Sequence, residues 1–253
     1  MRIDQLLVER GLAASRSQAV RLIAGGVRWR AASADADWRS VAKNGDDVPA
    51  TAQVELVDAA EARYVSRGGL KLEGALRSSG IDPRGARCLD VGQSTGGFTD
   101  CLLQHGAAHV VGVDVGHGQL NERVRDDARV TAVERVNARA LSAADLTQAG
   151  ACAEPFDLVV GDLSFISLTL VLPALVPLLA SHGAMLMLVK PQFELQPGQV
   201  GKGGIVRDPS LYALVEGRLR DACAQLHLTV AGWHDSPIAG GDGKREFFIH
   251  AVR

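Results

Sequence analysis

The chain has 253 residues, of which 47% are hydrophobic and 22% charged, and its formal net charge is -2. These values fit a globular protein with one large domain and a small attachment, and they exclude disordered and fibrous classes. Because the whole chain is not basic, any nucleic-acid footprint must be local. The charged N-terminus lacks the apolar stretch of a signal peptide, so a cytoplasmic protein is expected. The cysteines are scattered without zinc-ligand spacing and predict no metal site: Cys88, Cys101, Cys152 and Cys223.

The first sixty residues predict two short helices followed by small strands. Apolar residues at helical spacing over 3–12 predict the first helix. A Ser-x-x-Gln capping box at Ser15 begins the second helix, and Gly25–Gly26 ends it. Strands are expected over Val27–Trp29 and Gln53–Val57. Such short helices must pack on each other and on the strands to be stable.

Positive charge is concentrated in the first thirty residues, where six arginines face only Asp4 and Glu9. Charge alone fits a solvated helix surface as well as an RNA-binding face. The segment Ser-Arg-Ser-Gln-Ala-x-x-Leu-Ile-x-x-Gly-x-Val, however, resembles the S4 RNA-binding domain. That resemblance implies an S4-like α+β domain over residues 1–60 and a linker over 61–69. The RNA-binding candidates are Arg2, Arg10, Arg16, Arg21, Arg28 and Arg67.

The segment Leu163–Val189 contains no charged residue and is long enough to span a bilayer. Pro173, Pro177 and a predicted turn over 181–183 interrupt it. We therefore expect a buried helix followed by a strand, because covering helices and central parallel strands are often continuously apolar. No stable membrane association is predicted.

From Arg87 onward, strand and helix patterns alternate, which indicates an α/β fold with a parallel sheet. This second domain is expected to cover residues 70–253, with helices on both faces of a Rossmann-like sheet. The expected strands are Arg87–Val91, His109–Val113, Arg129–Val133, Phe156–Gly161, Ala184–Val189, Thr229–Trp233 and Glu246–Val252.

The first of these strands runs into a glycine-rich loop, Asp-Val-Gly-Gln-Ser-Thr-Gly-Gly-Phe, and then a helix. Glycines let a ligand approach the backbone closely, although the spacing does not fit the dinucleotide fingerprint G-x-G-x-x-G. Asp114 ends the next strand, about twenty residues further on, where an acidic side chain can accept hydrogen bonds from a ribose diol. A nucleoside cofactor is therefore predicted.

The pattern D-V-G-x-S-T-G-G-F-T-D followed by V-D-V-G resembles S-adenosylmethionine-dependent methyltransferases of the TlyA and FtsJ-like branch. The resemblance implies that Asn137 lies near the adenine, whereas Gln93 departs from the small residue expected at its position. The cofactor-binding candidates are Asp90, Gly92, Ser94, Gly96, Phe98, Asp114 and Asn137.

Four charged residues follow the order of the lysine-aspartate-lysine-glutamate tetrad of ribose 2′-O-methyltransferases: Lys71, Asp162, Lys190 and Glu246. Each alone is more often a surface charge. A ribose hydroxyl must lose its proton as it attacks an electrophilic methyl group, so a base is needed. We assign this role to Lys190, with Lys71 lowering its proton affinity and orienting the ribose. Asp162 and Glu246 would position the ammonium groups, and which lysine is neutral stays open.

Further segments, including Val-Lys-Pro-Gln-Phe-Glu and Gly-Lys-Gly-Gly-Ile-Val-Arg-Asp-Pro, extend the resemblance to the TlyA family over almost the whole chain. That family implies 2′-O-methylation of cytidine in ribosomal RNA, with ribosomal RNA or ribosomal subunits as partners. The alternatives are a membrane-active hemolysin, a label often given to the family, and a non-catalytic RNA-binding ribosome-assembly protein. Oligomeric state is not predicted.

Overall fold

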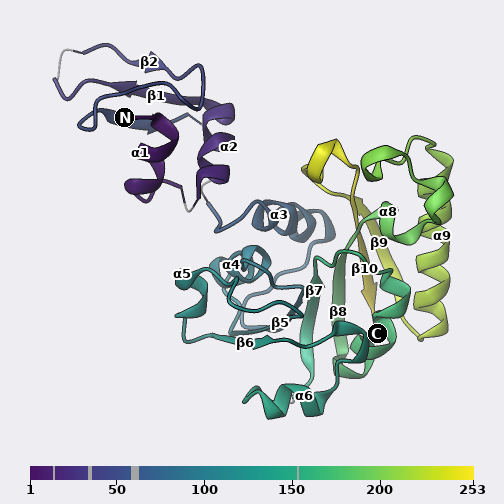
Figure 1. Cartoon of the computed structure of the whole chain (residues 1–253). Helices are drawn as coiled ribbons and strands as arrows, with labels where there is room; N and C mark the ends of the chain where they lie inside the picture. The colour runs from purple at the N-terminus through teal and green to yellow at the C-terminus, as the bar shows by residue number, and fades with distance from the viewer. Residues whose placement is uncertain (14, 34–35, 58–62, 153) are drawn as a thin grey trace. The chain divides into compact units, whose positions relative to one another are not determined.

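The computed structural model describes residues 1–13, 15–33, 36–57, 63–152 and 154–253. The chain divides into two compact units, Met1–Leu70 and Lys71–Arg253 (Figure 1). Residues 63–69 of the predicted linker belong to the first unit, and residues 61 and 62 lie outside the described residues.

The first unit packs two helices against a three-stranded antiparallel sheet of order β2-β1-β3. As predicted, Ser15 caps the second helix by accepting a hydrogen bond from the Gln18 backbone N–H at 3.2 Å. Strand β2 was missed because it is two exposed residues long and carries no alternating apolar pattern. The elements are α1 (Ile3–Glu9), α2 (Arg16–Gly26), β1 (Val27–Arg30), β2 (Arg39–Ser40) and β3 (Gln53–Leu56).

The second unit is built on a seven-stranded sheet of order β6-β5-β4-β7-β8-β10-β9. All seven predicted strands are present, with ends shifted by a few residues. The strands are β4 (Arg87–Val91), β5 (His109–Asp114), β6 (Val130–Glu134), β7 (Phe156–Gly161), β8 (Leu179–Val189), β9 (Thr229–Asp235) and β10 (Phe247–Val252). The helices are α3 (Gly68–Ser79), whose first three residues belong to the first unit, α4 (Gly97–Gln104), α5 (Glu122–Arg125), α6 (Ala143–Gln148), α7 (Leu172–Leu175), α8 (Pro191–Glu194) and α9 (Ser210–Gln225).

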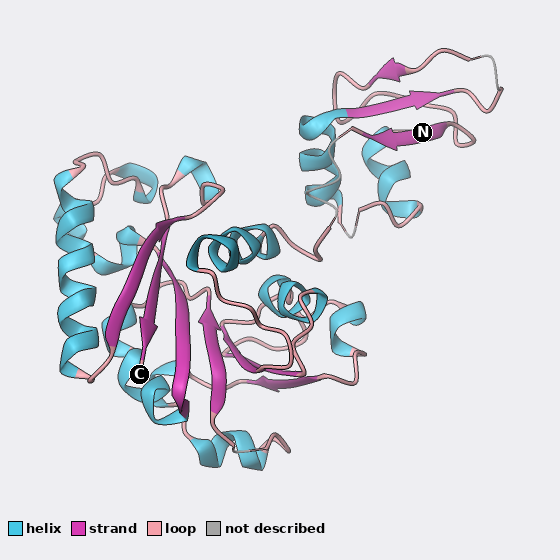
Figure 2. Cartoon of the chain, turned by 180° about the vertical axis from the view of Figure 1, so that it is seen from behind, coloured by secondary structure: helices cyan, strands magenta, loops and turns pink. Residues whose placement is uncertain are grey.

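The sheet is not wholly parallel, because β10 runs antiparallel to both of its neighbours, β8 and β9. Helices cover both faces, as expected (Figures 1 and 2). Leu89 and Val91 of β4 pack into the core with α6, α7 and α9. The alternate residue Asp90 faces α4, where it contacts Thr99.

The uncharged segment Leu163–Val189 forms part of this core, as predicted. Leu172 and Leu175 of α7 and the last five residues of β8 are buried. The turn predicted over 181–183 was wrong, because these residues lie within β8. A register shift in the pairing of β7 and β8 accommodates two exposed residues and a glycine there. Within the described part of the chain, no helix is both long and apolar enough to cross a membrane.

The order of the strands reverses at β4, which pairs with β5 on one side and with β7 on the other. Open α/β sheets bind ligands outside the carboxyl ends of the strands at such a switch point. Asp114 ends β5, and Asp162 and Lys190 directly follow β7 and β8. The topology therefore gathers the predicted site residues at one edge of the sheet.

Candidate active site

The glycine-rich loop after β4 has a backbone shape that requires glycine at two positions. Gly92 and Gly96 have φ values of 85° and 92°. A Cβ atom on Gly92 would lie 2.7 Å from the backbone oxygen of Asp162, and one on Gly96 would lie 2.8 Å from the side chain of Leu120. These contacts hold the loop tightly against β7 and the segment before α5.

Asp114 is held in place by the same loop. Its Oδ2 accepts a hydrogen bond from the Ser94 backbone N–H at 2.7 Å, and its Oδ1 accepts one from Gly116 at 2.7 Å. A carboxylate oxygen has more than one acceptor site, so Asp114 can still accept hydrogen bonds from a ligand hydroxyl. The loop and the carboxylate therefore form one preorganised edge that can accept hydrogen bonds from a ligand.

A cavity of about 500 Å³ opens beside this edge. Its volume suits a small-molecule ligand, and polar groups lie next to exposed apolar side chains such as Val115, which is 73% exposed. Five of the predicted residues line it: Gly92, Ser94, Asp114, Asn137 and Asp162. The remaining lining residues are Val113, Val115, Gln119, Val136, Ala138, Leu163, Ser164, Phe165 and Ile166.

Phe98 and Asp90 lie beneath the loop instead. The ring of Phe98 stacks on Phe248 with centroids 6.1 Å apart, within the core. Asp90 is fully buried and accepts a hydrogen bond from Thr99 Oγ1 at 2.7 Å, while its other oxygen has no hydrogen-bond partner among the described residues. Burial raises the pKa of Asp90 to about 7.

Gln93, which departs from the pattern of the family, has a structural explanation. Its Nε2 donates to Thr99 Oγ1 at 2.9 Å, so it completes a buried chain from Gln93 through Thr99 to Asp90. Its side chain occupies the space over Gly112 on β5, where a Cβ atom would lie 1.9 Å from it. The sequence did not indicate a role for Thr99, because its contact with Asp90 depends on the packing of α4.

The four tetrad candidates form two ion pairs. Lys71 Nζ lies 2.5 Å from Glu246 Oε2, and the two side chains are only 6% and 4% exposed. Lys190 forms an ion pair with Asp162 and donates a hydrogen bond to Ser164 Oγ at 2.8 Å. The β10–β8 pairing places Phe247 opposite Val189, so Glu246 and Lys190 each adjoin the last paired position at the same end of these two strands.

Phe165 is a feature of this site that the sequence did not single out. Its side chain is 90% exposed, although it lines the cavity and packs against the ring of Phe193, with ring centroids 5.1 Å apart. Its φ of 64° is left-handed, which costs about 1–2 kcal/mol for a residue other than glycine. An exposed aromatic ring held in a strained conformation at a cavity mouth points to contact with a ligand.

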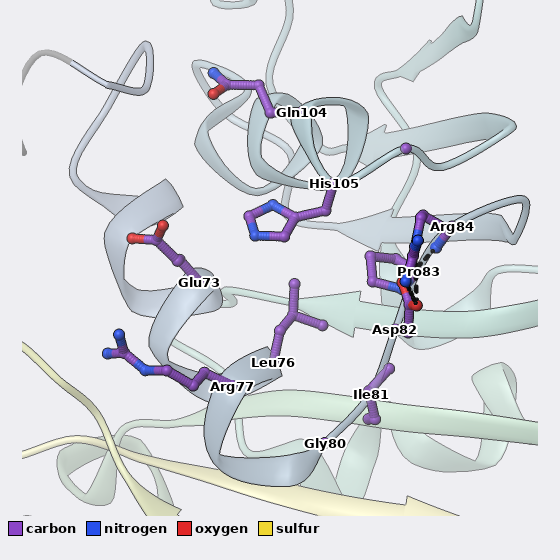
Figure 3. Close-up of a pocket in the computed structure, with 11 residues that line it drawn as sticks. Glu73, Leu76, Arg77, Gly80, Ile81, Asp82, Pro83, Arg84, Gln104 and His105 are labelled. Carbon is purple, nitrogen blue, oxygen red and sulfur yellow. Dashed lines mark hydrogen bonds and ion pairs between the residues drawn. The ribbon is translucent and has the colours of Figure 1, made fainter.

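A second cavity, of about 640 Å³, lies at the C-terminal ends of α3 and α4, away from the glycine-rich loop. The imidazole of His105 points toward Glu73 and Leu76, and Arg84 is paired with Asp82 (Figure 3). None of the predicted site residues lines it.

In the first unit, three of the candidate arginines hold their own fold together. Arg2 pairs with the buried Asp4 at 2.9 Å and, through that hydrogen bond, lowers the pKa of this carboxyl to about 2. Arg10 donates to two backbone carbonyls, and Arg28 pairs with Glu55 at 2.8 Å.

The other three arginines have different surroundings. Arg16 is 64% exposed and makes a longer contact of 3.4 Å with Asp4. Arg21 is half-buried and donates to the backbone oxygen of Ser17, and Arg67 is also half-buried. Arg16 is thus the candidate best placed to meet a phosphate.

Comparison with known proteins assigns the family. A model of the FtsJ-like methyltransferases matches residues 64–253. The chain is also 46% identical to the 16S/23S rRNA (cytidine-2′-O)-methyltransferase TlyA of Mycobacterium tuberculosis, across 98% of this chain and 88% of that protein. The chain belongs to the TlyA branch of the FtsJ-like methyltransferases.

Other TlyA-like proteins carry a different name. The chain is 35% identical to Hemolysin A of Brachyspira hyodysenteriae over the full length of both. A solved structure of a hemolysin-named protein from Streptococcus thermophilus has a TM-score of 0.75 at 38% identity, covering 100% of this chain and 88% of that one. Relatives of this TlyA-like chain thus bear both names, and the chemistry must be argued from its site.

Proposed function

We propose that this protein transfers the methyl group of S-adenosylmethionine to the ribose 2′-oxygen of a cytidine in ribosomal RNA. The observation that carries the proposal is that the tetrad candidates form two lysine–carboxylate pairs: Lys190 with Asp162, which lines the cavity, and Lys71 with Glu246, which is buried. The name of the Mycobacterium tuberculosis relative supports the choice of cytidine and ribosomal RNA.

The cavity residues fit the cofactor. Asp114 would accept hydrogen bonds from the ribose hydroxyls, Asn137 would contact the adenine, and Gly92 would allow close approach along the loop. When bound, S-adenosylmethionine supplies an electrophilic methyl group on a positively charged sulfur. The buried Asp90 carboxyl beneath the loop, whose pKa is raised further by Asp162 and Asp114, would favour this positive charge.

Proton removal falls to Lys190. The neutral amine at Nζ takes the proton of the 2′-hydroxyl as the oxygen attacks, and Asp162 stabilises the ammonium that forms. Ser164 Oγ fixes the direction of Nζ. Lys71, held in its ion pair with Glu246, would help to orient the ribose.

Cofactor binding is expected to release a proton from Asp90 near neutral pH. A positive charge bound in the cavity would lower the pKa of Asp90 from about 7, so affinity for S-adenosylmethionine should rise with pH between about 6 and 8, by at most about tenfold per unit. Titration calorimetry in buffers of different ionisation enthalpy measures the number of protons released on binding. The Asp90→Asn variant should release none, and equal release by this variant and wild type would contradict the role of Asp90.

A rise in pH should lower the stability of the fold, whereas it should raise the affinity for the cofactor. Because the pKa of Asp90 is raised above its ordinary value of 3.8, the folded state holds a proton that the unfolded chain has lost. The contribution to stability is fully present below about pH 4 and is lost as the pH rises through about 7. Free energies of unfolding of wild type and Asp90→Asn should therefore diverge in this window.

Phe165 would offer the face of its ring to the base of the target nucleotide. Stacking of a base on an aromatic side chain contributes about 1–3 kcal/mol, so Phe165→Ala should raise KM for RNA by roughly 5- to 150-fold. Phe165→Tyr keeps the ring and should stay near wild type. Steady-state kinetics on ribosomal RNA measure both, and an unchanged KM in Phe165→Ala would exclude this contact.

RNA binding by the first unit completes the proposal. The exposed guanidinium of Arg16, together with Arg21 further along α2, would neutralise phosphates. Because phosphate contacts release counterions, binding by these residues should weaken as salt concentration rises.

The decisive experiment is transfer of labelled methyl from S-adenosylmethionine to isolated small and large ribosomal subunits, followed by mapping of the product. A 2′-O-methylated cytidine supports the proposal. Cofactor binding without transfer to either subunit would favour the non-catalytic alternative, and a methyl group on a base would contradict the chemistry assigned to Lys190.

A further inference from the structure

Two segments of the site are joined across neighbouring strands. Residues 162–168 follow β7, and residues 190–194 follow β8. Near the cavity mouth, Lys190 contacts Asp162 and Ser164, and Phe193 contacts Phe165. Ser164 and Phe165 are exposed, so solvent can compete with the contacts that they make.

A further contact between these segments is buried. Glu194, which is 4% exposed, accepts a hydrogen bond from Ser167 Oγ at 2.5 Å and one from the Leu168 backbone N–H at 2.8 Å. Ser167 has a single hydroxyl proton, so its hydroxyl in turn accepts from Thr169, whose backbone N–H lies 3.2 Å away. Arg218 of α9 donates to the backbone oxygen of Glu194 and anchors the turn from the other side.

This buried contact acts close to the strained residue. Ser167 and Leu168 come two and three residues after Phe165, whose left-handed φ persists only if the surrounding structure fixes it. Hydrogen bonds to an ionised carboxylate are about twice as strong as neutral ones, and burial shields them from water. Burial raises the pKa of Glu194 above its ordinary value, and the hydrogen bonds from Ser167 and the Leu168 amide, which favour the ionised carboxylate, offset only part of this rise.

We propose that Glu194 is a positioning residue for methyl transfer, which fixes the loop bearing Ser164 and Phe165 against Lys190 through Ser167 and the Leu168 amide. The inference rests on the proposed function. Glu194 itself need not touch the substrate, because its carboxylate is occupied by the loop. Its loss displaces the ring of Phe165 and the hydroxyl of Ser164 that directs Lys190.

The first test measures the loop without any reaction. In Glu194→Ala the Leu168 amide loses its acceptor, so its hydrogen exchange should accelerate by roughly tenfold or more. The variant Val215→Ala leaves a small cavity in the core beneath α9, and it serves as the control for a general loss of stability. Exchange at Leu168 that is equal in Glu194→Ala and wild type overturns the inference.

The second test measures the coupling between Glu194 and Phe165, by comparing the effect of Glu194→Ala in the wild-type protein and in the Phe165→Ala variant. Alone, Glu194→Ala should lower kcat/KM for ribosomal RNA roughly ten- to hundredfold, and Ser167→Ala should have a smaller effect. On the Phe165→Ala background the further loss should be less than about threefold, because the two residues act as a unit.

Losses that multiply in the double variant, or a loss no larger than that of Val215→Ala, would overturn the positioning role. Absence of transfer by the wild-type protein is a different result. It overturns the proposed function itself, and the starting protein reveals it before any variant is compared.

Discussion

Replacing Lys190 with alanine should reduce methyl transfer by about 10²- to 10⁴-fold, the range for loss of a general base. Affinity for S-adenosylmethionine should change little, because Lys190 does not line the cavity of Gly92, Asp114 and Asn137. Single-turnover transfer to ribosomal RNA at saturating cofactor measures the loss. The control Arg220→Ala removes a surface cation that pairs with Glu216 on α9, and it should be fully active.

A second substitution separates proton transfer from charge. Lys190→Arg keeps the positive charge and can still pair with Asp162, but a guanidinium cannot give up its proton under these conditions. The arginine variant should therefore be as inactive as the alanine variant. Substantial activity in Lys190→Arg would show that this position supplies only positive charge, and the base would then have to be sought in Lys71.

The fold could be predicted largely from local patterns. Strand and helix alternation after Arg87 and the glycine-rich loop at Gly92 identified the sheet and its ligand-binding edge, because these signals lie in contiguous residues. The antiparallel direction of β10 has no local signature, since it depends on pairing between strands far apart in the chain. The irregular strand pairing at residues 181–183 also has no local signature, because the sequence of these residues resembles that of a turn.

The candidate site divides in the same way. Lys71 and Glu246 were found by motif, although the sequence could not show that they form one buried pair across 175 positions. Phe165 and Glu194 were present within recognised segments, but exposure, backbone strain and buried hydrogen bonds decide their importance. Such properties arise from tertiary packing and are not encoded at any single position.

The Lys71–Glu246 pair should have a large effect on stability when only one partner is removed. In Lys71→Met the carboxylate of Glu246 remains buried without its counter-charge, which should lower the free energy of unfolding by about 3–5 kcal/mol. Glu246→Leu leaves the ammonium of Lys71 in the same position and should be similarly unstable. Denaturant titration that follows the unfolding of the second unit measures both losses. A free energy of unfolding equal to that of the wild type in either variant would contradict a buried pair.

The double variant Lys71→Met/Glu246→Leu separates stability from catalysis. Replacing both charges with apolar side chains of similar size removes the desolvation cost together with the attraction, so stability should return to within about 1 kcal/mol of wild type. Methyl transfer should stay at the level of the single variants, because the ammonium group of Lys71 is not restored. Recovery of transfer together with stability would mean that the pair only supports the fold, whereas stable but inactive protein assigns it to the reaction.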